Sequence, residues 1–433
     1  MDAFELARHE DPALAGSRAS LSAAEARHGQ ALAQLRPQLS ASATGAWNHR
    51  DYETLNTPSS LPFTTPPEIS SYPNGTAQLT LNQPLWRRSN FIAVTESLRA
   101  SEQSQSELQA AVQDMAVRLT QAWFDLMLAS DDIAAAEEKR AAGHLFWDQA
   151  QKAADIGLAG PEELEDAHAK YESAVAERMA AVTELDTARA TLEEIIGTFE
   201  PFVPPELADG YVVPPPVAAD LGGWLERVDT GPLVQAARDA RLAADEEIRK
   251  QEAGHGLTVD IVGNITRNYQ KQGNFPGQDG YDIRQRSIGL QASLPLYTGG
   301  ALSAKVKEAV ALRNKADQDL RAAARKARST AEVAWSGWRS GCVRIEAARQ
   351  SLHAARIALQ VVESGSGKGL KFELDVVQAR QNFAAAWRDL QKSRYDAVMS
   401  RLKLKAVAGE LGEDDVRELH RNMTSRPPTA PVP

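Results

Sequence analysis

The chain has 433 residues, with 48 lysines and arginines, 58 aspartates and glutamates, and one cysteine, Cys342. Its net charge of −10 argues against nucleic-acid binding, which needs a concentrated cationic face, and a single cysteine excludes a disulfide framework. No apolar stretch reaches the ~18 residues of a membrane-spanning helix, but transmembrane β-strands of about 9–11 alternating residues stay open. The first residues lack the basic and apolar regions of a signal peptide, which suits a cytosolic chain or a mature exported one.

The first half of the chain predicts a helix, two strands and two further helices. Each strand segment alternates between apolar and polar side chains, so each has one apolar face. The longest helical segment is rich in Ala, Leu, Gln and Glu and lacks proline. The expected elements are a helix at 7–35, strands at 38–48 and 76–82, a hairpin loop at 51–74, and helices at 90–156 and 162–196.

The second half predicts the same series of elements. The expected elements are a helix at 232–253, strands at 257–266 and 287–294, a hairpin loop at 270–284, and helices at 301–364 and 371–408. The longer helix of each half would extend ~100 Å at a rise of about 1.5 Å per residue. Ala-rich faces suit close, coiled-coil-like packing, and shorter helices stacked end to end would match the long ones.

Landmarks recur at a fixed distance and indicate a tandem duplication. Trp123 and Trp335 are 212 residues apart, as are Gly157 and Gly369, and Gly197 and Gly409. Two copies are too few for an open solenoid, so the units must close against each other or against other subunits. The expected organisation is a first repeat at 1–200, with hairpins at 38–87 and 89–196; a linker at 201–230; a second repeat at 231–411, with hairpins at 257–297 and 301–408; and a C-terminal tail at 412–433, disordered at its end.

Four strands cannot close a barrel by themselves, because about eight are the minimum. Closure would need several protomers, and three copies would supply twelve strands. The long loops at one end and helices at the other are typical of an outer-membrane barrel. A sheet with one wetted face in a soluble protein fits the same pattern and stays open as an alternative.

Motifs in order along nearly the whole chain resemble the TolC family of outer-membrane efflux and secretion proteins. No single motif is diagnostic, but their order and spacing in both repeats are specific. The segments that carry the resemblance are Ala7 to Leu14, Leu35 to Leu39, Ile288 to Gly300, Gly369 to Ala379 and Leu402 to Leu411.

The resemblance implies an α+β membrane protein: a homotrimeric, twelve-stranded β-barrel, four strands per protomer, continuous with a long α-helical periplasmic tunnel. It implies a passive exit duct in the outer membrane, energised by an inner-membrane ABC or proton-driven transporter through a periplasmic adaptor protein. The motif in the second half of the chain is most similar to that of the subgroup that serves type I protein secretion. Drug efflux remains an alternative function. The resemblance implies neither an enzyme nor a cofactor, metal or nucleic acid.

Site residues follow from the resemblance alone. It places axis-facing acidic residues six and nine positions after the second turn glycine, which here are Asp375 and Gln378. Three copies of Asp375 would form a ring that attracts cations in a pore constriction. A tunnel latch would join Lys371 to Glu162 or Glu163. For each charge taken alone, a solvated position at a helix end is the other interpretation.

The glycine-rich segment and the histidines are not expected to form binding sites. The Gly365 to Gly369 segment lacks the spacing of a phosphate-binding loop and is expected as a helix-ending turn. The histidines, such as His144 and His168, have no metal-ligand spacing and are expected as scattered surface residues. Besides the export duct, the sequence leaves open a soluble structural or adaptor protein built from helical hairpins.

Overall fold

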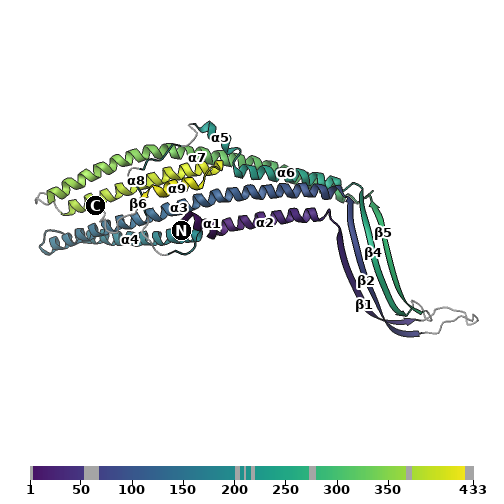
Figure 1. Ribbon diagram of the computed structural model, residues 1–433. Helices are drawn as coiled ribbons and strands as arrows, with labels where there is room; N and C mark the ends of the chain where they lie inside the picture. The colour runs from purple at the N-terminus through teal and green to yellow at the C-terminus, as the bar shows by residue number, and fades with distance from the viewer. Residues whose placement is uncertain are drawn as a thin grey trace, which may run out of the picture. The chain divides into compact units, whose positions relative to one another are not determined.

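The computed structural model describes residues 3–52, 68–199, 205–208, 211–215, 220–272, 279–366 and 373–424, whose helices and strands are drawn in Figure 1. The chain divides into two compact units. The first unit comprises Met1–Ser22, Glu102–Arg238 and Gln318–Pro433. The second comprises Ala23–Ser101 and Asp239–Asp317. Each unit therefore draws on both halves of the sequence.

Helices account for most of the described chain, and five of them correspond to predicted ones, whereas the predicted helix at 7–35 is divided in two. The helices are α1 (Ala3–Glu10), α2 (Pro12–Ala33), α3 (Arg88–Asp155), α4 (Pro161–Ile196), α5 (Leu221–Val228), α6 (Pro232–Ala253), α7 (Ala301–Ser366), α8 (Glu373–Ala408) and α9 (Glu413–Arg421). Their ends have local causes. Proline opens α4 at its first position, and Gly197 closes it with φ of 76°, where its N–H bonds the carbonyl of Glu193.

The single helix predicted at 7–35 is wrong, because the structure divides it into α1 and α2 at Asp11. Pro12 has no N–H to continue the first helix, and it suits the first position of a new one. The Asp11 carboxylate accepts hydrogen bonds from the N–H groups of Ala13 at 3.4 Å and Leu14 at 3.3 Å. This cap fixes the start of α2.

The second unit contains a four-stranded antiparallel sheet in the order β1-β2-β4-β5. Its strands are β1 (Gln38–Tyr52), β2 (Glu68–Trp86), β4 (Thr258–Gln272) and β5 (Asp279–Ser293). The hairpin loops predicted at 51–74 and 270–284 are wrong at their ends, where 51–52, 68–74, 270–272 and 279–284 belong to strands; the rest of both loops lies outside the described residues. Polar side chains at these strand ends have the composition of a loop, but the ladder pairs them in register from Gln38↔Asn82 to Tyr52↔Glu68.

Elements in the predicted linker and tail segments complete the first unit. Short strands β3 (Glu206–Leu207) and β6 (Met423–Thr424) pair antiparallel, and α5 and α9 lie near them in the sequence. The tail end from 425 onwards lies outside the described residues. None of these four elements is predicted by the sequence patterns.

The core of the first unit joins α1, α3, α4, α7, α8 and α9. Phe124 of α3 stacks on Tyr395 of α8 with ring centroids 4.6 Å apart, and Leu192 and Leu402 are fully buried in the same apolar cluster. A side-chain carbon added at Gly341 would lie 2.8 Å from Cβ of Ala397, so α7 and α8 approach closely there. Trp123 and Trp335 pack at the edges of the two apolar clusters of this unit.

Within the described part of the chain, no helix combines the length and apolar character required to cross a membrane.

Candidate functional site

The four-stranded sheet has one continuous apolar face and one polar face. The register places Leu39, Leu81 and Gly263 in one row across the strands, and Ala41, Leu79 and Ile265 in the next row. Since side chains alternate between faces along each strand, all of these point to the same side. The apolar faces predicted separately for the four strands therefore merge into one surface.

Side chains of this apolar face are exposed. Relative exposure is 67% for Leu39, 77% for Ile288 and 73% for Leu290, values that are unusual for large aliphatic residues. An exposed apolar surface that continues over four strands marks a contact with lipid or with another chain. On β1 the uninterrupted apolar series extends from Leu39 to Trp47, nine residues, which matches the length of a transmembrane strand, about 9–11 residues.

The opposite face of the sheet is polar and internally hydrogen-bonded. Thr80 donates to Asn264 Oδ1 at 3.1 Å, and Gln78 Nε2 donates to Thr80 Oγ1 at 3.1 Å. At the helix-proximal end, Arg87 makes a bidentate pair with buried Asp260, at 2.8 and 2.7 Å. This face has the hydrogen-bonding capacity to line a water-filled space.

The turn after α3 lies at one end of the first helical hairpin. Gly157 adopts φ of 75°, which favours glycine, and its N–H bonds the carbonyl of Ala154 at 3.0 Å. The N–H of Leu158 bonds the carbonyl of Ala153 at 2.8 Å, which completes a helix-terminating Schellman motif. Leu158 itself is largely exposed, so the turn presents an apolar side chain outward.

Most predicted site residues lie on the first turns of α4 and α8. Glu162 and Glu163 are exposed in the first turn of α4. Asp375 and Gln378 are exposed near the start of α8, and Gln378 Nε2 donates to Asn382 Oδ1 at 3.4 Å. Lys371 lies outside the described residues, as does the expected turn glycine before it.

Ion pairs connect the two helices of each hairpin. On the first hairpin, Glu137 accepts from Arg140 at 2.6 Å and from Arg178 of α4 at 2.6 Å. The hydrogen bond from Arg140, assisted by Arg178, holds the pKa of Glu137 below its ordinary value. The ion pairs of Glu137 with Arg140 and Arg178 are therefore fully formed above the ordinary pKa of glutamate. They are lost only as the pH falls through the lowered pKa of Glu137. On the second hairpin, Arg380 of α8 bonds Glu363 of α7 at 3.1 Å.

An aromatic cluster between α3 and α4 was not predicted. Trp147 stacks on Tyr171 with centroids 5.4 Å apart, His168 lies 4.8 Å from Trp147, and His144 meets Tyr171 edge-on at 5.4 Å. Both histidines contact aromatic rings, but they remain surface residues as expected, since His144 is exposed and the side chain of His168 is 43% exposed. The available signal was the i, i+3 spacing of an aromatic pair on each helix. The described residues include no group of three or more metal-binding side chains.

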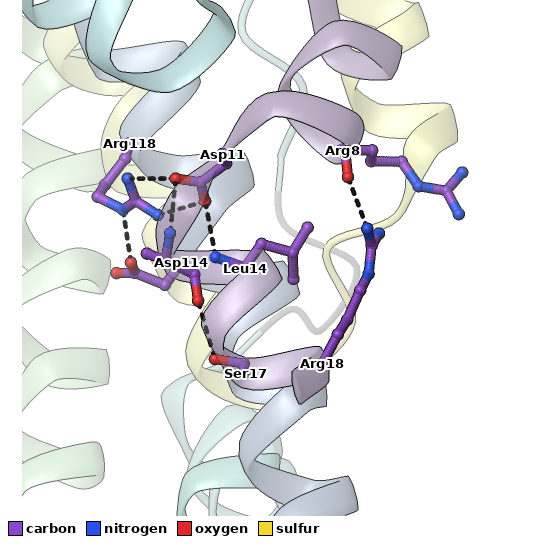
Figure 2. Close-up of polar contacts among 8 residues, drawn as sticks. Arg8, Asp11, Leu14, Ser17, Arg18, Asp114 and Arg118 are labelled. Atoms are coloured by element: carbon purple, nitrogen blue, oxygen red, sulfur yellow. Dashed lines mark hydrogen bonds and ion pairs between the residues drawn. The ribbon is translucent and has the colours of Figure 1, made fainter. Parts of the chain in front are cut away.

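A buried carboxylate near the start of α2 also escaped the sequence patterns. Figure 2 shows Asp11 at the α1–α2 junction, where Arg118 of α3 donates to its Oδ2 at 2.8 Å. Asp114 shares the same guanidinium at 2.7 Å, and Arg18 bonds the carbonyl of Arg8 across the junction at 2.9 Å. The junction is therefore held by a cap and an ion pair on one carboxylate.

Asp11→Ala is expected to lower the free energy of unfolding by about 2 kcal/mol, because it removes both a helix cap and a partner of Arg118. Asp11 is 2% exposed, whereas Asp114 is 66% exposed on its side chain. Asp114→Ala is the matched control, and its expected cost is below about 1 kcal/mol, as for surface ion pairs. Denaturant unfolding of the detergent-purified protein measures both. Equal losses would contradict the role assigned to Asp11.

The chain is similar to known proteins over nearly its whole length. The family described as outer membrane efflux protein matches residues 3–198 and 229–410. The chain belongs to this family. Outer membrane protein TolC of Escherichia coli (strain K12) is 26% identical over 439 residues, which cover 99% of this chain and 85% of that protein. The proteases secretion protein PrtF of Dickeya chrysanthemi is 25% identical over 446 residues, covering 99% and 91% of the two chains.

A solved structure shows the same fold. The Campylobacter jejuni CmeC outer membrane channel superposes with a TM-score of 0.71 and 16% identity, over 97% of this chain and 88% of that one. As a member of the outer membrane efflux protein family, the chain localises to the outer membrane. Its general role is transport, as an efflux or secretion channel.

Proposed function

We propose that three copies of this chain form a passive exit duct through the outer membrane. Each protomer contributes four strands to a twelve-stranded barrel, and the long helices continue it as a periplasmic tunnel. An inner-membrane transporter energises export, and a periplasmic adaptor protein couples it to the duct.

The two-faced sheet is the observation that supports this proposal best. The sheet has an exposed apolar face for lipid and a polar face for a water-filled lumen. Strands β1 and β5 form its two edges, and among the described strands of one protomer each pairs with one neighbour. Pairing β5 of one protomer with β1 of the next removes all edges when the ring closes.

The proposed duplication explains why one protomer supplies two hairpins. In each half a helix of 22 residues precedes the strands, and helices of 68 and 36 residues, or 66 and 36, follow them. The family match also falls into one segment per half. Duplication within a threefold assembly would give a quasi-sixfold wall.

We infer that the exported cargo is protein, delivered by type I secretion through an ABC-type transporter. PrtF and the alkaline protease secretion protein AprF of Pseudomonas aeruginosa, 25% and 23% identical, support this inference, and drug efflux is the alternative. Deleting the gene should abolish secretion of a protease-like substrate while leaving drug sensitivity unchanged. The reverse result would assign drug efflux.

Membrane extraction and conductance test the duct itself. The protein should leave the membrane fraction only with detergent, run as a trimer, and open discrete conductances in planar bilayers. A freely soluble, non-conducting particle would instead favour a helical structural or adaptor protein. Membership of an outer-membrane family weighs against that alternative.

Asp375→Ala is expected to weaken block of the channel by multivalent cations on the order of tenfold, since the proposed ring loses three charges. Gln378→Glu should strengthen block, because it adds a second ring one turn further along α8. Planar-bilayer conductance with added trivalent cations measures both. Unchanged block in the two variants would remove Asp375 from the constriction.

Lys371→Ala is expected to raise single-channel conductance by opening the proposed latch to Glu162 or Glu163. The Lys371→Ala/Glu162→Gln/Glu163→Gln variant should conduct no better than Lys371→Ala alone, because the same pairing is lost. Additive increases would show that the three residues act independently. No increase at all would assign the latch to other residues.

A further inference from the structure

Basic side chains follow the apolar band on the same face of the sheet. Along β4, Arg267 lies two positions after Ile265, towards the hairpin end. Along β5, Arg286 and Arg284 follow Ile288 at the same two-residue spacing, again towards the hairpin end. Because side chains alternate between faces, all three arginines share the side of the apolar residues. On β4 and β5 they end the apolar series on the side away from α3 and α7, and the residues in register with them on β1 are Ala41 and Ala43.

The strand register brings these arginines together. Arg267 pairs directly with Arg284, and Arg286 pairs with Ile265 on the adjacent row. Directly opposed side chains on neighbouring antiparallel strands have Cβ atoms about 4.5–5.5 Å apart. Three guanidinium groups therefore gather on two strands. Like charges directly opposed destabilise a sheet unless a counterion lies between them.

One carboxylate offsets part of this charge. Asp282 accepts from Arg267 at 3.0 and 2.8 Å, and it lies 3.8 Å from Arg284. The group of four residues keeps a formal charge of +2. The side chain of Arg284 is 73% exposed and that of Arg267 56%, so both can reach a ligand outside the sheet.

We propose that Arg267, Arg284 and Arg286 bind the phosphate groups of phosphorylated lipid in the outer leaflet. The inference rests on the proposed function, in which the apolar face meets lipid and the hairpin ends point out of the cell. Guanidinium forks bind phosphate oxygens in bidentate fashion. Ile265, which lies beside Arg286, and Ile288, one row nearer the helices, contact the acyl chains of the same lipid. This apolar neighbourhood favours a lipid over a free phosphate ion.

Lipid retention by the intact trimer tests this site. The purified protein is exchanged into nanodiscs that contain a glycolipid with phosphorylated headgroups or its dephosphorylated form, and bound lipid is counted by native mass spectrometry. The Arg284→Gln/Arg286→Gln variant should retain at least tenfold less phosphorylated lipid and the same amount of dephosphorylated lipid. The Lys305→Gln/Lys307→Gln variant, which removes the same charge from exposed positions of α7, should behave as wild type.

Several outcomes would overturn the proposal: equal retention by both double variants, equal loss of both lipids, or full displacement of lipid by millimolar inorganic phosphate. An Arg284→Lys/Arg286→Lys variant keeps the positive charge but loses the bidentate donors of the guanidinium groups, so it should show intermediate retention of phosphorylated lipid. This variant replaces the glutamine variant in the test if the glutamine variant fails to fold. Planar-bilayer conductance separates the two proposals. If the wild-type trimer conducts but shows no preference for phosphorylated lipid, only the lipid site is contradicted. If the wild-type protein does not conduct at all, the proposed duct is contradicted.

Discussion

Leu290→Arg is expected to prevent stable insertion of the protein into the outer membrane. Leu290 lies within the apolar band of β5, and it is opposite Ile261 of β4. Arginine on the lipid face near the middle of a bilayer costs about 2–4 kcal/mol. Three copies in one trimer multiply that cost. The measurements are the amount of trimer in the membrane fraction and the free energy of unfolding in bilayers.

Gln291→Arg provides the matched control, because the neighbouring residue on the same strand faces the other side of the sheet. A polar, water-filled lumen tolerates arginine, so this variant should insert normally and change only ion selectivity. The pair Ala41→Arg and Ser42→Arg repeats the comparison on β1, where Ala41 belongs to the apolar face. Equal damage from both members of a pair would contradict the assignment of the faces.

Arg394→Met is expected to lower the free energy of unfolding by about 3 kcal/mol. Arg394 is 2% exposed in the first unit. It donates to the carbonyl of Leu207 at 3.3 Å, to the carbonyl of Ala208, and to Gln391 Oε1 at 3.2 Å. Methionine fills similar space but donates no hydrogen bond, so buried acceptors lose their partner. Denaturant unfolding of the detergent-purified protein measures the loss.

Two companion variants separate charge from geometry at this position. Arg394→Lys keeps the charge but reaches fewer of the acceptors, so we expect an intermediate loss. Arg325→Met, at an exposed position of α7, should cost less than about 0.5 kcal/mol. A loss at Arg394 no larger than that at Arg325 would show that the link to β3 adds little stability.

Helix positions followed closely from the sequence, because helix formation depends on neighbours within a few residues. The helix predicted at 232–253 is α6, residue for residue, and its proline start is a local signal. The break at Asp11 also has a local signal in Pro12, and the prediction of one helix at 7–35 failed because it passed over that proline. The pattern of small residues continues across 7–35, and only the pairing of Asp11 with Arg118, 107 residues away, shows how strongly that break is held.

The elements that sequence patterns missed depend on distant partners. The strands β3 and β6 have two residues each, too few for any periodicity, and they pair across more than 200 positions. Buried Arg394 looks like any charged helix residue until the carbonyls of 207 and 208 are placed beside it. The aromatic cluster similarly needs the two helices of a hairpin in a defined register.

The sequence by itself determined the two-faced strands, the long helices and the membership implied by ordered motifs, because alternation and helix propensity are local properties. Only the tertiary structure decided the strand order, the single apolar surface, and the meeting of Arg267 with Arg284. Strand pairing is set by contacts between segments as far apart as β2 and β4, and a one-residue slip would move every side chain to the other face. The acidic chain thus contains a local basic patch that its net charge conceals.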